Sequence, residues 1–185
     1  MRGKMKNFEK FIAESFNSHL KEARLINEKK KRKKKTYSKF LFLDFDDTLF
    51  DNETQSMMEG EAYQALVDSM SDPEPCYICI VTARRSDTKE FVKEKVTRSI
   101  EDLLEEFKGK LEIETVLDDA VESKPSVYEV AKLKADCINT IINDNVENLQ
   151  ENILVYFFDD VEENVKEVSN TLDYLNIPTD NCYIV

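Results

Sequence analysis

The chain has 185 residues and a formal net charge of -12, with 41% hydrophobic and 35% charged residues. This is enough apolar material for one core beneath a charged surface. Its three glycines lie far apart, which excludes glycine-rich nucleotide loops, and its single histidine excludes histidine-rich zinc sites and argues against a Ser-His-Asp triad. No apolar run reaches the roughly 18 residues of a membrane span. The first residues lack the apolar segment of a signal peptide, so we expect a cytoplasmic protein.

The beginning of the chain is basic and the rest is acidic. Residues 1–39 hold 14 Lys/Arg against 4 Asp/Glu, a net charge of +10, and the remainder holds 12 against 34, a net charge of -22. Most of the basic excess lies in Lys29–Lys35. This run is equally typical of an arm that binds nucleic acid through its phosphates and of a solvated linker.

Residues Asn7–Ile26 carry apolar side chains at steps of three and four, which predicts an amphipathic helix. Such a helix packs on a core or on a partner helix, and a membrane-surface helix is the less favoured alternative. The pattern of apolar and charged residues changes near residue 40. We therefore expect a basic, partly helical N-terminal extension at residues 1–38 and a separate domain at residues 39–185.

Short apolar runs then alternate with helical patterns. The runs predict strands at residues 40–45, 77–82, 111–117, 153–158 and 182–185. The helical patterns cover residues 91–107, 125–142 and 161–175. This alternation predicts an α/β domain in three layers, a Rossmann-like parallel sheet covered on both faces. Ligands of such sheets bind beyond the carboxyl ends of the strands.

Cys76 and Cys79 form a C-x-x-C pair, and Cys137 and Cys182 are the other cysteines. The pair lies in an apolar run typical of a strand, where positions three apart face opposite sides. A redox pair favours a helix N-terminus, and zinc needs two further ligands. We expect buried, reduced thiols.

Polar and mostly acidic residues follow the strands, at Asp44–Thr48, Thr82–Arg85 and Asp159–Asp160, and Lys124 precedes a helix. Clustered carboxylates repel one another unless a cation or a lysine lies among them. Carboxylate oxygens without histidine or thiolate favour Mg²⁺. These groups permit phosphoryl transfer, in which one carboxylate attacks phosphorus and a second donates a proton to the leaving oxygen. Magnesium and lysine would offset the phosphate charge.

The sequence resembles the phosphatases of the haloacid dehalogenase superfamily. Residues 44–49, Asp-Phe-Asp-Asp-Thr-Leu, match the first motif of that family, D-x-D-[GD]-T-[LV]. Thr82 matches the second motif, Lys124 the third and Asp159–Asp160 the fourth, in the right order. The resemblance covers residues 40–185 and not the N-terminal extension.

The resemblance implies a role for each acidic residue. Asp44 would be the nucleophile and a magnesium ligand, and Asp46 the general acid and base, with its backbone carbonyl on the metal. Asp160 would be the further metal ligand, supported by Asp159. Without the resemblance, Asp44 and Asp46 are also compatible with a strand-end turn, and Asp159–Asp160 with a helix N-cap.

The resemblance further implies that Thr82 and Lys124 bind the phosphoryl group. The alternatives are a hydroxyl at the edge of the core for Thr82 and a solvated lysine at a helix start for Lys124. Asp118–Asp119 also ends a strand, but no family motif includes it, and a turn or helix cap is the favoured interpretation.

The segments between the motifs are too short for the folded cap domain of many family members. Capless members frequently act on large substrates. The Thr82-Ala83-Arg84 stretch is similar to Ser-Gly-Arg in the phosphatase half of phage-type polynucleotide kinase-phosphatases, so Arg84 is a candidate substrate-binding residue and Arg85 a weaker one. The acidic domain argues against a polyanion unless Lys29–Lys35 compensates.

We therefore expect a magnesium-dependent phosphomonoester hydrolase that acts through an aspartyl-phosphate, on a nucleotide or a nucleic-acid end. The alternatives are a small-metabolite or phosphoprotein phosphatase and a non-catalytic interaction protein with the same fold. The sequence leaves the oligomeric state open.

Overall fold

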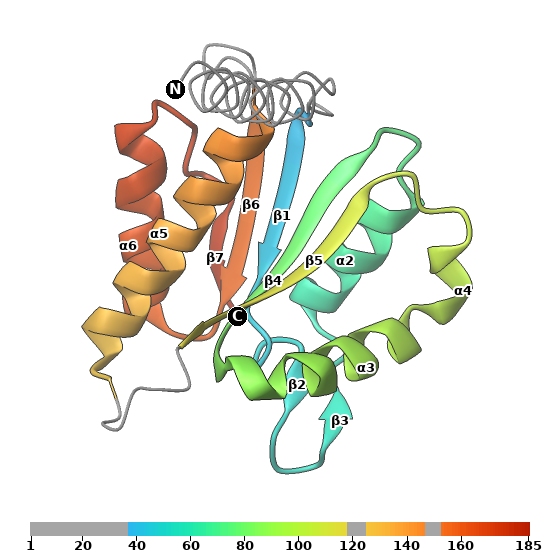
Figure 1. The fold of residues 1–185 in the computed structure, drawn as a ribbon. Helices are drawn as coiled ribbons and strands as arrows, with labels where there is room; N and C mark the ends of the chain where they lie inside the picture. Colours follow the sequence, from blue (N-terminus) through green and yellow to red (C-terminus); the bar gives the residue numbers. More distant parts are fainter. Residues whose placement is uncertain (1–36, 118–124, 147–152) are drawn as a thin grey trace, which may run out of the picture. The chain divides into compact units, whose positions relative to one another are not determined.

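A computed structural model describes residues 37–117, 125–146 and 153–185 of the chain. Its centre is a sheet of five strands that all pair in parallel, in the order β5-β4-β1-β6-β7 (Figure 1). The bounds of these strands, in that order, are Lys110–Leu117, Cys76–Arg85, Lys39–Leu43, Leu154–Asp159 and Cys182–Ile184. A two-stranded hairpin, β2 (Phe50–Asp51) and β3 (Ser56–Met57), follows β1.

Helices cover both faces of this sheet (Figure 1). Helices α5 (Val127–Asn145) and α6 (Glu162–Tyr174) lie on one face. Helices α2 (Glu61–Ser71), α3 (Lys89–Ser99) and α4 (Glu101–Leu104) lie on the other, and a short 3-10 turn, η1 (Ser86–Thr88), precedes α3. The three-layer α/β architecture expected from the alternation of strands and helices is confirmed.

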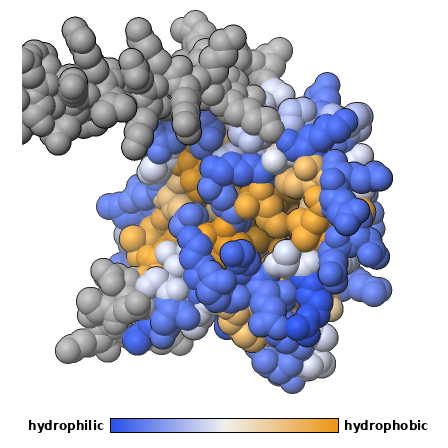
Figure 2. Space-filling view, turned by 45° about the vertical axis from the view of Figure 1, so that its right-hand side comes forward, coloured by the Kyte–Doolittle hydropathy of each residue, from blue (hydrophilic) through white to orange (hydrophobic). Residues whose placement is uncertain are grey.

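The central strand β1 is apolar at successive positions because both of its faces are buried. Its side chains alternate between the two cores, with Phe40 and Phe42 on the α5–α6 side and Leu41 and Leu43 on the other. All four are fully buried, as expected for a parallel strand with helices on both faces. Hydrophilic residues cover most of the face in Figure 2, and hydrophobic residues are exposed at its centre.

The two cysteines of the C-x-x-C pair are buried, as expected, whereas Cys137 and Cys182 are partly exposed. Cys76 and Cys79 are buried in opposite cores, and all four cysteines of the chain are free thiols. Burial raises the pKa of the Cys76 thiol to about 11, which keeps it protonated at neutral pH. The C-x-x-C pair is therefore neither a disulfide nor a metal-binding pair in this fold.

Most elements begin or end one to three residues from the expected bounds, and two differences are larger in consequence. The single helix expected over residues 91–107 is interrupted at Ile100, whose backbone leaves helical geometry (φ -125°, ψ 19°) while its side chain enters the core at 2% exposure. Strand β4 continues three residues past Thr82, because Arg85 pairs with Leu117 of β5 after an irregularity in the register. Thr82 thus lies inside a strand rather than at its end.

Several sequence features lie outside the described residues. They are the expected N-terminal extension up to residue 36, including Lys29–Lys35, and the segment that contains Asp118–Asp119 and Lys124. The described chain begins at Tyr37, which is buried against Phe40 and Tyr77. Among the described helices, none combines the length and apolar character needed to cross a membrane.

Candidate active site

The loop after β1 places two carboxylates at the carboxyl edge of the sheet. Asp44 continues the strand for one residue, since its N–H donates to the Phe158 carbonyl at 2.9 Å. Asp47 then adopts a left-handed conformation (φ 56°), which aspartate tolerates better than most residues. The N–H groups of Leu49 and Phe50 return to the Phe45 carbonyl at 3.0 and 2.8 Å. This tight loop buries Asp44 at 4% exposure and leaves Asp46 partly exposed.

Three carboxylates meet at this edge, as the sequence predicts. One oxygen each from Asp44, Asp159 and Asp160 lies within 4.8 Å of the others. Lys134 binds two of them, because its Nζ donates to Asp44 Oδ1 and to Asp159 Oδ2, both at 2.7 Å. Asp159 and Lys134 are 0% and 1% exposed, so the ion pairs are shielded from solvent. The site is a buried charge cluster rather than a solvated acidic patch.

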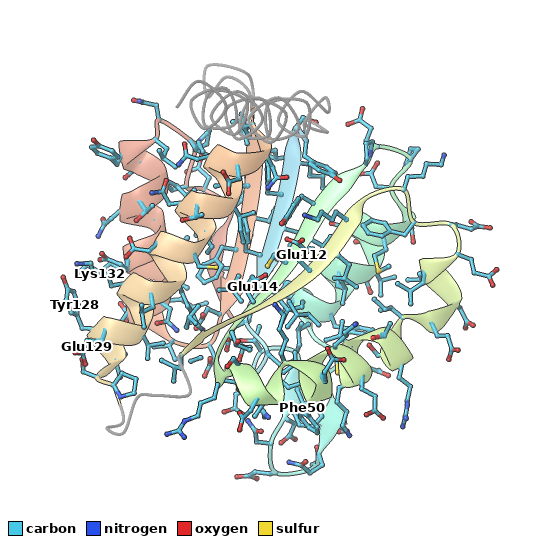
Figure 3. All side chains as sticks on the ribbon, viewed as in Figure 1. Phe50, Glu112, Glu114, Tyr128, Glu129 and Lys132 are labelled. Atoms are coloured by element: carbon cyan, nitrogen blue, oxygen red, sulfur yellow. The ribbon has the colours of Figure 1, made fainter. Side chains whose placement is uncertain are left out.

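Sequence reasoning missed Lys134. It lies on the buried face of α5, in helical register with Ala131, Ala135 and Ile138. Lys132, two residues earlier, is exposed on the outer face of the same helix (Figure 3). The signal in the sequence is a lysine at a position where the apolar stripe of a helix demands a buried side chain. Lys124, the lysine expected here, lies outside the described residues.

Asn164 is a second residue that sequence reasoning missed. It lies in the first turn of α6, is 2% exposed, and donates from Nδ2 to Asp159 Oδ1 at 2.8 Å. The Val161 N–H donates to the same oxygen at 3.0 Å. Asp159 is thus held by Lys134, Asn164 and the backbone, whereas Asp160 is less buried and nearer to solvent. The Oδ1 atom of Asn164 is buried without a hydrogen-bond partner in the described structure.

Asp46 is held from two other directions. Arg84, near the end of β4, donates from Nε to both Asp46 oxygens at 3.1 and 2.9 Å and from an Nη to Oδ1 at 2.6 Å. Thr82, fully buried, donates to Oδ2 at 3.4 Å. Asn52, in the β2–β3 hairpin, donates to Oδ1 at 2.9 Å. The structure therefore brings Thr82 and Arg84 to Asp46, and adds Asn52, which the sequence did not suggest.

The surroundings of Asp44 and Asp46 shift the pKa values of these two residues in opposite directions. Burial raises the pKa of Asp44 to about 7, although the nearby Lys134 opposes the shift. Burial acts in the same direction on Asp46, but hydrogen bonds from Arg84 and Asn52 outweigh it and hold the Asp46 pKa below its usual range. Burial opposes the charge of Lys134, yet the carboxylates of Asp44 and Asp159 raise its pKa overall. Asp46 is thus ionised at neutral pH, and Lys134 is a cation.

A cavity of about 250 Å³ opens beside the charge cluster. Its polar lining includes Asp44, Asp46, Lys134, Asp160 and Asn164, and its apolar lining includes Pro125, Val127 and Val130 at the start of α5. The volume lies below the usual range of small-ligand pockets, about 300–1,000 Å³. The cavity is large enough for a phosphoryl group, and a larger ligand would extend to the surface.

The donor set fits a hard divalent cation. Asp44 and Asp160 offer carboxylate oxygens within 4.8 Å of each other, and both residues line the cavity. No histidine or cysteine lines this cavity in the described part of the chain. Oxygen ligands without nitrogen or sulfur match Mg²⁺ rather than zinc. Burial, together with the negative charge of Asp159, raises the pKa of Asp160.

The chain has no match among protein-family models or among curated proteins. The resemblance to the haloacid dehalogenase superfamily therefore stays a prediction from short segments, which in the described chain are Asp44–Leu49, Thr82 and Asp159–Asp160. The parallel sheet brings the carboxylates of these segments to one edge.

The raised pKa of Asp44 predicts a pH dependence of stability. The ordinary value is 3.8 and the folded value is about 7, so between them the folded protein holds a proton that the unfolded chain has lost. The stabilising contribution is fully present below pH 3.8 and is lost as pH rises through about 7. We expect the melting temperature in chelator to fall more between pH 5 and pH 8 for the wild type than for Asp44→Asn. Equal falls in melting temperature for the two proteins would contradict the raised pKa of Asp44.

Proposed function

We propose that this protein is a magnesium-dependent phosphomonoester hydrolase that forms an aspartyl-phosphate on Asp44, a phosphatase of the haloacid dehalogenase type. One observation carries the proposal. Asp44, Asp159 and Asp160 converge at the carboxyl edge of a parallel sheet, with Lys134 between two of them, beside a cavity large enough for a phosphoryl group. Burying these charges costs desolvation free energy, and buried ion pairs return little net stability. A role in stability alone is therefore a poor explanation of the cluster.

In the first half-reaction, a carboxylate oxygen of Asp44 attacks the phosphorus. The bond from phosphorus to the ester oxygen breaks, and Asp46, which must first take up a proton from solvent when substrate binds, gives that proton to the ester oxygen, so that an alcohol leaves. Lys134 holds Asp44 at one oxygen and keeps a positive charge next to the incoming anion. Thr82, beside Asp46, supplies a hydroxyl for a phosphoryl oxygen.

In the second half-reaction, Asp46 acts as a base. It takes a proton from a water molecule, the water oxygen bonds to phosphorus, and the bond from phosphorus to Asp44 breaks. Inorganic phosphate leaves and the Asp44 carboxylate is restored. The lowered pKa of Asp46 in the free protein suits this step, which needs the ionised form.

Asp44, the Asp46 backbone carbonyl and Asp160 would hold the metal ion, with Asp159 orienting Lys134 and Asn164. Magnesium, when bound, offsets the negative charge of the phosphoryl group as the nucleophile approaches. Lys124 stays a candidate for phosphate binding on the strength of the resemblance alone.

Magnesium is expected to stabilise the folded protein. At ten times the dissociation constant it raises the free energy of unfolding by about 1.4 kcal/mol, because only the folded chain gathers the ligands. Asp160→Asn should remove most of this gain, as should Asp44→Asn. Asp180→Asn, an exposed residue just before β7, is the matched control and should keep it. Thermal unfolding with and without Mg²⁺ measures the effect, and an unchanged gain in Asp160→Asn would exclude that residue as a ligand.

The substrate that we favour is a nucleotide or a nucleic-acid end. The cavity is small and open to solvent, and the described segment between β1 and β4 contains a hairpin and one helix rather than a cap. A large substrate can therefore close the site itself. The basic run Lys29–Lys35 and the guanidinium of Arg84 at the site add positive charge. The net charge of -22 beyond residue 39 favours a small phosphomonoester as the second candidate, because it repels a polyanion.

Phosphate release tests the proposal and separates these substrates. The panel is 3'- and 5'-phosphorylated oligonucleotides, nucleoside monophosphates and an aryl phosphate, each with Mg²⁺ or with chelator. We expect release that requires Mg²⁺. Deletion of residues 1–35, which leaves the buried Tyr37 in place, should weaken oligonucleotide turnover and its salt dependence and spare the aryl phosphate. Equal effects on both substrates would remove nucleic acid from the proposal, and no release from any substrate would contradict the activity.

A further inference from the structure

Three side chains from three separate segments form a closed ring at the mouth of the site. Asp46 comes from the loop after β1, Asn52 from the β2–β3 hairpin and Arg84 from β4. Asn52 donates from Nδ2 to Asp46 Oδ1 at 2.9 Å and accepts from an Nη of Arg84 on its Oδ1 at 3.0 Å. Arg84 closes the ring on Asp46 at 2.6 Å. Asn52 is thus the member that binds both of the others through one amide.

The ring stands on an aromatic base that also holds the hairpin. The Arg84 guanidinium lies 5.2 Å from the Phe45 ring and 5.0 Å from the Phe91 ring. Phe50, the first residue of β2, stacks on Phe45 at 4.9 Å and meets Phe91 edge-on at 5.8 Å. Figure 3 shows Phe50 beside α3, which carries Phe91. The base of the hairpin, two residues before Asn52, is therefore anchored beside the ring.

Arg84 and Asn52 differ in the form of Asp46 that they can hold. A guanidinium binds a carboxylate strongly but gains little from a protonated carboxyl, and an incoming phosphate competes for it. A neutral amide also binds a carboxylate more strongly than a protonated carboxyl, but it keeps a hydrogen bond to the carbonyl oxygen of the protonated form. The Thr82 contact, at 3.4 Å, is long. When Asp46 carries the proton for the leaving group, Asn52 is the close donor that still fixes its orientation.

We propose that Asn52 is a positioning residue that aims the Asp46 carboxyl at the leaving oxygen, so that the β2–β3 hairpin takes part in proton donation. The inference rests on the proposed function, because it assigns a task to the hairpin within the first half-reaction. Asn52 itself touches neither the phosphorus nor the nucleophile.

The test compares leaving groups. An aryl phosphate, 4-nitrophenyl phosphate, expels a stable phenolate without a proton, whereas an alkyl phosphate, β-glycerol phosphate, requires one. The value of kcat/KM reports the first half-reaction alone. Asn52→Ala should lower kcat/KM for the alkyl phosphate about 10- to 100-fold and change that for the aryl phosphate by less than about threefold. Asn52→Asp, which keeps the acceptor for Arg84 but loses the donor to Asp46, should behave in the same way.

Thr54→Ala is the matched control. Thr54 is an exposed polar residue of the same hairpin, and its hydroxyl contacts Asp51 and Ser56 and not the ring. The Thr54→Ala change should leave kcat/KM unaffected for both the alkyl and the aryl phosphate. Equal losses on the two substrates in Asn52→Ala, or no loss on the alkyl phosphate, would overturn the inference.

A second measurement does not depend on activity. Loss of the Asn52 hydrogen bonds should speed amide exchange of residues 50–57 about fivefold or more, and it should shift the NMR signal of the Arg84 Nε–H group. Unchanged exchange and an unchanged signal would overturn the inference even in an inactive protein. Absence of all phosphate release from the wild type would instead count against the proposed function.

Discussion

Replacing Lys134 by methionine is expected to lower the free energy of unfolding by about 3–5 kcal/mol, measured at pH 8 in chelator. The side chain is 1% exposed and bridges two carboxylates at 2.7 Å. Methionine fills a similar volume but leaves Asp44 and Asp159 facing each other without a cation, and removal of one partner from a buried ion pair is costly. For a domain of this size the melting temperature should fall by roughly 10 °C.

Lys132→Met is the matched control. Lys132 lies on the same helix two residues away, and its side chain is exposed (Figure 3). Its replacement should change the free energy of unfolding by no more than about 0.5 kcal/mol. In the Asp44→Asn background the cost of Lys134→Met should shrink, since only Asp159 is then left uncompensated. Equal costs in the two backgrounds, or equal costs for Lys132 and Lys134, would contradict the bridge.

Lys124→Met separates the roles of the two lysines. The resemblance predicts that Lys124 binds the phosphoryl group, whereas the geometry predicts that Lys134 holds Asp44 next to that group. Loss of Lys124 should therefore reduce turnover without the large loss of stability expected for Lys134. A Lys124→Met protein with unchanged kcat and KM would assign the family's third motif to Lys134.

Asp44→Asn is expected to reduce phosphate release at least about 10⁴-fold, because the amide cannot form the acyl phosphate. The same change should not destabilise the protein at pH 8. Burial disfavours the ionised form of Asp44, as its raised pKa indicates, and asparagine has the same shape without that charge. A loss of activity in a protein that melts no lower than the wild type identifies a chemical role. The exposed Asp180→Asn should retain full activity, and an active Asp44→Asn enzyme would exclude the proposed nucleophile.

Much of this fold could be predicted because it depends on local pattern. The run Phe40–Leu43 reads as a buried strand, since both faces of β1 are covered, and the polar residues that follow the parallel strands must meet at one edge. Asp44 and Asp159–Asp160 are therefore brought together as expected. The opposite facing of Cys76 and Cys79 follows from strand geometry in the same way.

The missed residues depend on tertiary contacts. A lysine within the apolar stripe of α5 makes physical sense only when Asp44 and Asp159 face it from two strands. Asn52 lies in a hairpin whose strands have two residues each, too short for any alternating pattern to indicate where its side chain points. The interruption at Ile100 has a related cause, because the core and not local helix propensity decides where that side chain lies.

The most direct test of the proposed chemistry is chemical trapping of the phosphorylated residue. The protein is mixed with its best substrate and Mg²⁺ and quenched within milliseconds. Borohydride then reduces any aspartyl-phosphate to homoserine, which peptide mass spectrometry locates. The prediction is homoserine at position 44, absent in chelator and absent in Asp44→Asn. Phosphate release without any modification of Asp44, or with modification at another residue, would contradict the mechanism proposed for this site.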